Sequence, residues 1–244
     1  MKNTLGHIVS FFLSVRTTIW LTFALLFVLL YGSIIMPLRE EFGALHSMPL
    51  FGWLEVMPAE ITWWLWAAIV ILSGLTVNTL FCSVESVIKK RGARHWLLIL
   101  SPQVIHAGFL LILLAHLLSS AGGFRGNAVA AKGQMLGLPN GISFVIDEIN
   151  AAVGPRGYIE DWSVGIKYFN QGKQIASDVI RPNSPSFIEG YGIYVKTVEP
   201  EPVWSAVIEV DRDPGAVWAL AGGIFFLVGI TTLLMLKISR EEQQ

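Results

Sequence analysis

Residues 96–121 read WLLILSPQVIHAGFLLILLAHLLSSA, and the architecture of the chain can be worked out from this stretch. An apolar run of this length can cross the roughly 30 Å core of a bilayer, which takes about 20 residues of helix. Lipid offers no hydrogen-bond partners to free backbone groups, so the spanning form is an α-helix. The run holds no lysine, arginine, aspartate or glutamate, yet it carries His106 and His116.

Three further apolar runs, at 19–36, 61–84 and 215–236, are long enough to span as well. Of the 244 residues, 53% are hydrophobic and 14% are charged, which excludes a purely soluble globular protein. A single cysteine excludes an internal disulfide framework and covalent haem attachment through CxxCH on this chain, and a net charge of -1 gives no footprint for nucleic acid. We therefore expect a membrane protein with four transmembrane α-helices.

The basic residues predict the orientation, because lysine and arginine gather in cytoplasmic loops. They lie between the second and third runs and near both termini: Lys89, Lys90, Arg91 and Arg94, then Lys2, Arg16, Lys237 and Arg240. We expect both termini in the cytoplasm and residues 122–214 outside. We also expect the tryptophans near the run ends to anchor the helices at the lipid interface: Trp20, Trp63, Trp64, Trp96 and Trp218.

Between the third and fourth runs the composition changes to one rich in acidic residues, proline and glycine. Short strand patterns recur there, bounded by turn sequences such as Asn140-Gly141 and residues 170–173. They cover residues 142–146, 163–169, 174–180, 191–198 and 203–210. The domains we expect are a membrane domain at 1–121 with helices at 19–36, 61–84 and 96–121, a small extracytoplasmic antiparallel β domain at 122–214, and a fourth transmembrane helix with a cytoplasmic tail at 215–244. The β domain has no histidine and no catalytic or metal-ligand spacing.

The two histidines of the third run are the candidate functional residues, because burying an ionisable side chain in lipid is costly. Neutral imidazole is a common ligand of haem iron, and it can also relay protons. Ten residues of helix separate them by about 15 Å along the axis and about 80° around it, so they cannot bind one iron together. The other runs hold no histidine, so a second haem ligand would come from another protein. Alternatively, each histidine only bonds to a neighbouring helix, as we expect of Asn78.

The chain resembles the ResB (CcsB) family of system II cytochrome c biogenesis in bacteria and plastids, through segments spread in order over nearly its whole length. In the membrane runs these are residues 13–20 (LSVRTTIW), 32–37 (GSIIMP), 78–82 (NTLFC) and 105–109 (IHAGF). Beyond them follow residues 123–126 (GFRG), 144–147 (FVID), 162–164 (WSV), 181–185 (RPNSP), 190–194 (GYGIY) and 213–215 (DPG).

The resemblance implies a subunit that works with a ResC (CcsA) type haem lyase in the bacterial cytoplasmic (inner) membrane. Together the two would bind haem b transiently, pass it to the outer face and support its covalent attachment to apocytochrome c. His106 matches the family's membrane histidine, which implies a haem axial ligand and a metal contact through haem iron. His116 is a further haem-binding candidate but matches no position of the family. The chain by itself would be non-catalytic, with haem, apocytochrome c, the lyase and membrane lipid as partners and no nucleic acid.

Two departures from the family bear on this expectation. The outer domain is short, and the tryptophan-rich haem loop of the lyase is missing, so the attachment chemistry cannot be placed on this chain alone. Two alternatives stay open. The chain could be the haem b membrane anchor of a respiratory oxidoreductase, although such anchors carry ligand histidines on two of their own helices. It could also be an assembly scaffold that binds no haem.

Overall fold

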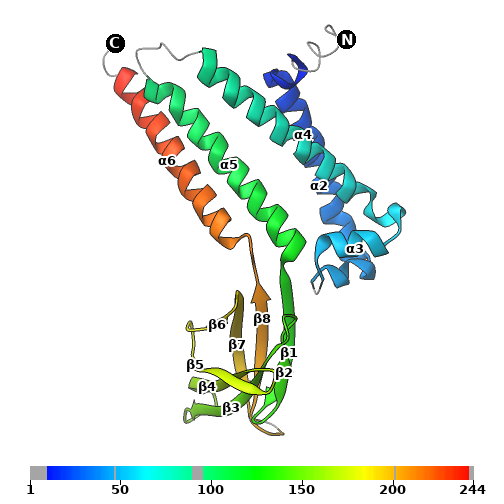
Figure 1. The fold of residues 1–244 in the computed structure, drawn as a ribbon, viewed down its shortest axis with the longest axis vertical. Coiled ribbons are helices and arrows are strands. Elements are labelled where there is room, and N and C mark those ends of the chain that lie inside the picture. Colours follow the sequence, from blue (N-terminus) through cyan, green and yellow to red (C-terminus); the bar gives the residue numbers. More distant parts are fainter. Residues whose placement is uncertain (1–9, 47, 90–95, 201, 242–244) are drawn as a thin grey trace. The chain divides into compact units, whose positions relative to one another are not determined.

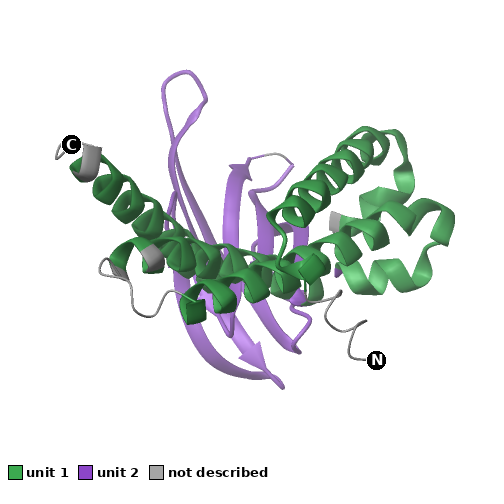
Figure 2. Cartoon of the chain, turned by 90° about the horizontal axis from the view of Figure 1, so that it is seen from above, with its two compact units in different colours: residues 1–45, 50–121, 215–244 green, residues 46–49, 122–214 purple. Residues whose placement is uncertain are grey.

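The computed structural model describes residues 10–46, 48–89, 96–200 and 202–241. The chain divides into two compact units, which Figure 2 shows in separate colours. Residues 1–45, 50–121 and 215–244 form the helical unit, and residues 46–49 and 122–214 form the unit that contains the β-strands. Four long helices and an antiparallel β domain between the third and fourth of them confirm the predicted fold class.

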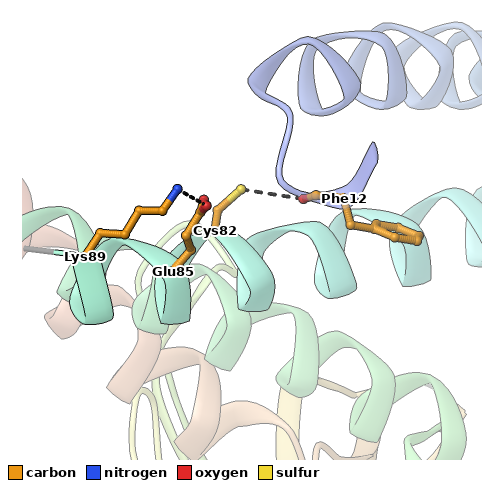
Figure 3. A network of polar contacts seen from close by, with 4 residues as sticks. All are labelled: Phe12, Cys82, Glu85 and Lys89. Carbon is orange, nitrogen blue, oxygen red and sulfur yellow. Dashed lines mark hydrogen bonds and ion pairs between the residues drawn. The ribbon is translucent and has the colours of Figure 1, made fainter. Parts of the chain in front are cut away.

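The long helices are α2 (Val15–Ile35), α4 (Ala59–Lys89), α5 (Trp96–Gly122) and α6 (Ala216–Glu241), labelled in Figure 1. All four are long and apolar enough to cross a membrane. Helix α4 continues five residues past the predicted run. Its last turn carries an ion pair between Lys89 and Glu85, one helical turn apart (Figure 3). A cation there also meets the negative end of the helix dipole, which supports the extension.

Helices α5 and α6 pack closely through small residues that recur every seven positions. Gly215 immediately precedes α6, Gly222 and Gly229 lie within it, and Ser101, Gly108 and Ala115 lie along α5. A Cβ added at Gly222 would lie 2.8 Å from the Gly108 carbonyl oxygen and 2.9 Å from the Ile112 amide nitrogen. The two backbones therefore touch, as in membrane helix pairs whose association depends on small residues.

Helix α4 is joined to α2 and to the segment before it by polar groups. The Asn78 side chain, 1% exposed, donates to the Phe12 carbonyl oxygen at 2.7 Å and accepts from the Thr18 hydroxyl at 2.6 Å. One turn later the Cys82 thiol donates to the same carbonyl at 3.6 Å (Figure 3). Asn78 is thus the interhelical hydrogen-bonding residue that the sequence predicted.

A cluster of aromatic side chains holds the segment between α2 and α4, which contains η1 (Met36–Leu38), η2 (Glu40–His46) and α3 (Leu50–Val56). Phe42 stacks on Trp53 with ring centroids 5.2 Å apart and also contacts Trp64. The expectation that Trp64 anchors the lipid interface is wrong, because it is 4% exposed. Gly32 of α2 has no side chain, and the Trp64 ring occupies that space. Trp20, Trp63 and Trp218 are exposed.

The β domain consists of two four-stranded antiparallel sheets. One has the order β1-β8-β7-β6 and the other β2-β3-β4-β5. The strands are β1 (Phe124–Ala131), β2 (Met135–Gly137), β3 (Ile142–Val153), β4 (Ile159–Asn170), β5 (Lys173–Ile180), β6 (Ser186–Ile188), β7 (Tyr191–Glu199) and β8 (Ser205–Arg212). One hydrophobic core takes side chains from both sheets, so they pack face to face as a sandwich. The predicted hairpin turn at 170–173 is present, and Gln171 and Gly172 both have positive φ.

A chain of polar groups connects the two sheets, and two of its three members, Tyr168 and Ser186, are buried. The Tyr168 hydroxyl of β4 donates to the Ser186 hydroxyl of β6 at 2.7 Å. Ser186 in turn donates to the Asp178 carboxylate of β5 at 2.6 Å. Burial raises the pKa of Tyr168 to about 12; the hydrogen bond with Ser186 opposes this rise, and the Asp178 carboxylate adds to it.

This buried tyrosine predicts a loss of stability in alkali. An unfolded tyrosine releases its proton near pH 10, whereas folded Tyr168 keeps it to about pH 12. The stabilisation of the fold that comes from the protonated Tyr168 is therefore complete below pH 10. It is lost as the pH rises toward 12, and the loss amounts to about 2–3 kcal/mol of unfolding free energy. We expect Tyr168→Phe to lose less stability than wild type between pH 8 and pH 11, measured as unfolding of the full chain by near-UV circular dichroism. Tyr158→Phe is the matched control, because the Tyr158 side chain is exposed; equal pH dependence in all three proteins would contradict the assignment.

Some predictions fall on positions that the structure does not describe. The basic residues Lys2, Lys90, Arg91 and Arg94, and the side chains of Trp96 and Arg240, lie outside the described residues. Lys89, Arg16 and Lys237 are described and exposed. The predicted orientation thus stays a prediction.

Candidate functional site

The site is built around His106, which lies within α5 and is half-buried. Two neighbouring helices fix this part of α5. On one side α6 contacts Gly108, two residues after the histidine. On the other side Ser83 of α4 places its Oγ 2.8 Å from His106 Nδ1. Residues 23 positions apart in the sequence are thereby joined inside the helical unit.

The contact with Ser83 engages one of the two ring nitrogens of His106. The structure gives the other nitrogen, Nε2, no hydrogen-bond partner among the described residues. A neutral imidazole has one protonated and one unprotonated nitrogen, and the unprotonated one can bind a metal. With Nδ1 next to a hydroxyl that can accept its proton, Nε2 is the nitrogen available for a ligand.

A second polar side chain lies on the same part of α5. Gln103 precedes His106 by three residues, a spacing that places both on neighbouring positions of one helix face. The Gln103 Oε1 atom is buried and has no hydrogen-bond partner in the described part of the chain. Buried polar atoms are almost always satisfied, so this oxygen, like the buried Trp64 Nε1, is available to a donor outside the described residues.

The structure does not bring His116 to this site. It lies ten residues further along α5, about 15 Å along the axis, and its side chain is exposed. The residues described by the structure give it no hydrogen bond or ion pair. Nothing in its surroundings distinguishes a ligand from an exposed helix side chain, and its part in haem binding stays a prediction.

The arrangement offers a single imidazole to a metal. Helices α2, α4 and α6 contain no histidine. Within the described residues, no three His, Cys, Asp or Glu side chains are grouped as a metal site would need. Among the four long helices only α5 carries histidine. As a donor, His106 fits one axial ligand to a haem whose other ligand would come from elsewhere.

Sequence reasoning identified His106 but missed Ser83 and Gln103. Serine in an apolar helix commonly bonds to the carbonyl four residues earlier, as Ser73 and Ser101 do here. Nothing in the sequence separates Ser83 from them. Glutamine within an otherwise apolar run was a signal that could have drawn attention to Gln103.

Comparisons with known proteins add one significant relative. No protein-family model matches the chain. The chain is 28% identical over 108 residues to the cytochrome c biogenesis protein Ccs1 of Gracilaria tenuistipitata var. liui, a match that covers 39% of this chain and 25% of that protein. The chain thus spans about a quarter of the length of the curated relative that it matches. This relative confirms the resemblance to cytochrome c biogenesis proteins.

Among solved structures, the cytochrome c heme lyase CcmF aligns with 91% of this chain and 35% of its own. The TM-score is 0.46 and the sequence identity is 14%.

Proposed function

We propose that this chain is a membrane subunit of cytochrome c biogenesis in which His106 gives one axial ligand to a haem shared with a partner. The observation that carries the proposal is the half-buried His106. Its Nδ1 lies beside Ser83 Oγ, and its Nε2 has no hydrogen-bond partner among the described residues. The match to Ccs1 supports the biological setting. The partner would be a ResC (CcsA) type haem lyase, and the recipient would be apocytochrome c.

Each residue of the site would have a separate role in haem binding. His106 would bind through Nε2, and α5 would hold it at a fixed depth against α6. The Gln103 Oε1 atom, which has no hydrogen-bond partner among the described residues, would lie on the face that meets the partner or the ligand. Haem, when bound, would supply an iron for the two axial ligands and vinyl groups that react with cysteine thiols. The thioether chemistry itself would belong to the lyase, so this chain would be non-catalytic.

The proposal includes the location of the parts. The chain would lie in a bacterial cytoplasmic membrane with both termini inside. The β sandwich between α5 and α6 would then lie on the outer side, where apocytochrome c is matured. The distribution of lysine and arginine supports this orientation.

Deleting this chain while keeping the lyase partner and the apocytochrome tests the proposal. We expect covalent haem attachment, measured by haem staining of denaturing gels, to fall to background and to return when the wild-type chain is supplied. Immunodetection of apocytochrome and partner controls for their amounts. Undiminished attachment in the deletion strain would refute a role in cytochrome c biogenesis.

A further inference from the structure

We propose that Ser83 is the positioning residue of this site: its hydroxyl accepts the Nδ1 proton of His106 and holds the ring with Nε2 free for iron. The inference rests on the proposed function and extends it to a residue on a second helix. Its geometric basis is the 2.8 Å separation between Ser83 Oγ and His106 Nδ1, which joins α4 to α5.

The chemistry of imidazole requires such a group. When a metal binds Nε2, the ring proton lies on Nδ1, and this N–H needs an acceptor. An N–H that is taken out of water and left without an acceptor destabilises its site. Metal-bound histidines almost always donate this second N–H to a neighbouring oxygen, which sets the ring orientation and strengthens the ligand. Ser83 Oγ is the oxygen that the structure places there.

The contact of Ser83 differs from those of Ser73 and Thr76 on the same helix and of Ser101 on α5. Ser73, Thr76 and Ser101 all donate to a carbonyl of their own helix. Ser83 instead contacts a side chain of the neighbouring helix.

The position of Ser83 is also fixed from the other side of α4. Asn78 and Cys82 both bond to the Phe12 carbonyl oxygen, and Figure 3 shows the bond from Cys82. Ser83 is the next residue, turned about 100° from Cys82 around the helix. The anchored face therefore holds the hydroxyl at a constant place opposite His106.

The test compares Ser83→Ala with wild type in the complex of the full chain and its lyase partner, loaded with haem b. We expect the haem dissociation constant to rise about 10–100-fold, the range seen when such outer partners of a ligand are removed. The midpoint potential of the remaining bound haem should also rise, because a less electron-rich imidazole stabilises ferric iron less. Ser83→Thr keeps a hydroxyl and should restore both quantities. Ser73→Ala is the matched control on the same helix and should change neither.

Three outcomes would overturn the inference. In the first, Ser83→Ala leaves affinity and potential at wild-type values while His106→Gly removes the haem; the proposed function then stands without Ser83. In the second, Ser83→Ala weakens binding but leaves the potential unchanged and Ser83→Thr does not rescue it, which is the behaviour of a purely structural residue. In the third, His106→Gly leaves the haem unaffected, and the proposed function fails together with the inference.

Discussion

Replacing His106 with glycine is expected to reduce haem bound to the complex with the lyase partner by more than about tenfold. Removing a group that only supports a ligand costs about 10–100-fold in metal affinity, and removing the ligand itself must cost at least as much. Added imidazole should restore binding, because the space left by the side chain admits a free ring that offers the same nitrogen to iron. The measurement is the haem absorption spectrum of the purified complex, normalised to protein, with and without imidazole.

His116→Gly is the matched control, since it removes the same side chain from the same helix at an exposed position without described partners. Because the proposal assigns the ligand to His106, this variant should leave the spectrum unchanged, and a changed spectrum would instead bear out His116 as a haem-binding residue. The isolated chain should bind haem poorly, because it supplies one ligand. A stable bis-histidine haem on the isolated chain would contradict the proposal. Unaltered haem in the His106→Gly complex would favour the scaffold alternative and direct attention to the β sandwich.

The second large effect concerns the contact between α5 and α6. Gly222→Val is expected to destabilise the protein by about 1–3 kcal/mol, the usual range for overpacking a tight interior. The atoms that a new Cβ meets are the backbone oxygen of Gly108 and the backbone nitrogen of Ile112, at 2.8 and 2.9 Å. Backbone atoms cannot turn aside as a side chain can, so the helices must separate. A lower thermal unfolding midpoint in detergent, followed by tryptophan fluorescence, measures this cost.

Gly223→Val provides a control one residue away. A Cβ at Gly223 meets nothing within 4 Å, and we expect a change within about 0.5 kcal/mol. The two variants have the same composition and differ only in which face of α6 receives the side chain. Equal midpoints for both would show that the close approach of α5 and α6 is not maintained in the protein.

The four spanning helices could be predicted because each apolar run alone exceeds the length that a bilayer requires. The β domain was predicted less completely. Strand β1 was missed because its residues 124–131 (FRGNAVAA) are mostly small and have low strand preference. Its conformation depends on pairing with β8, which lies about 80 residues later in the sequence. Strand pairing over that distance leaves no recognisable strand pattern in the sequence of β1 itself.

In the candidate site, too, some residues could be predicted from one segment of sequence and others could not. His106 could be identified because an ionisable group in an apolar run is exceptional. The contribution of Ser83 depends on which face of α4 meets α5, and α4 is apolar on several faces. Trp64 was assigned to the interface for a similar reason: its burial depends on the missing side chain of Gly32, on another helix. Properties of one segment were predictable, whereas contacts between segments were not.

The seven-residue spacing of small residues on α5 and α6 limits how the helix that carries His106 can move. A short slide of α5 along α6 would bring bulky side chains against backbone that only glycine now meets. The next register that restores the match is seven residues away, about 10.5 Å along the axis. Helix α5 is therefore held against sliding along α6, and the His106 imidazole keeps its level along the helix axis. If haem binds His106 as proposed, its outward movement would require transfer to a new ligand, because His106 itself would not move with it.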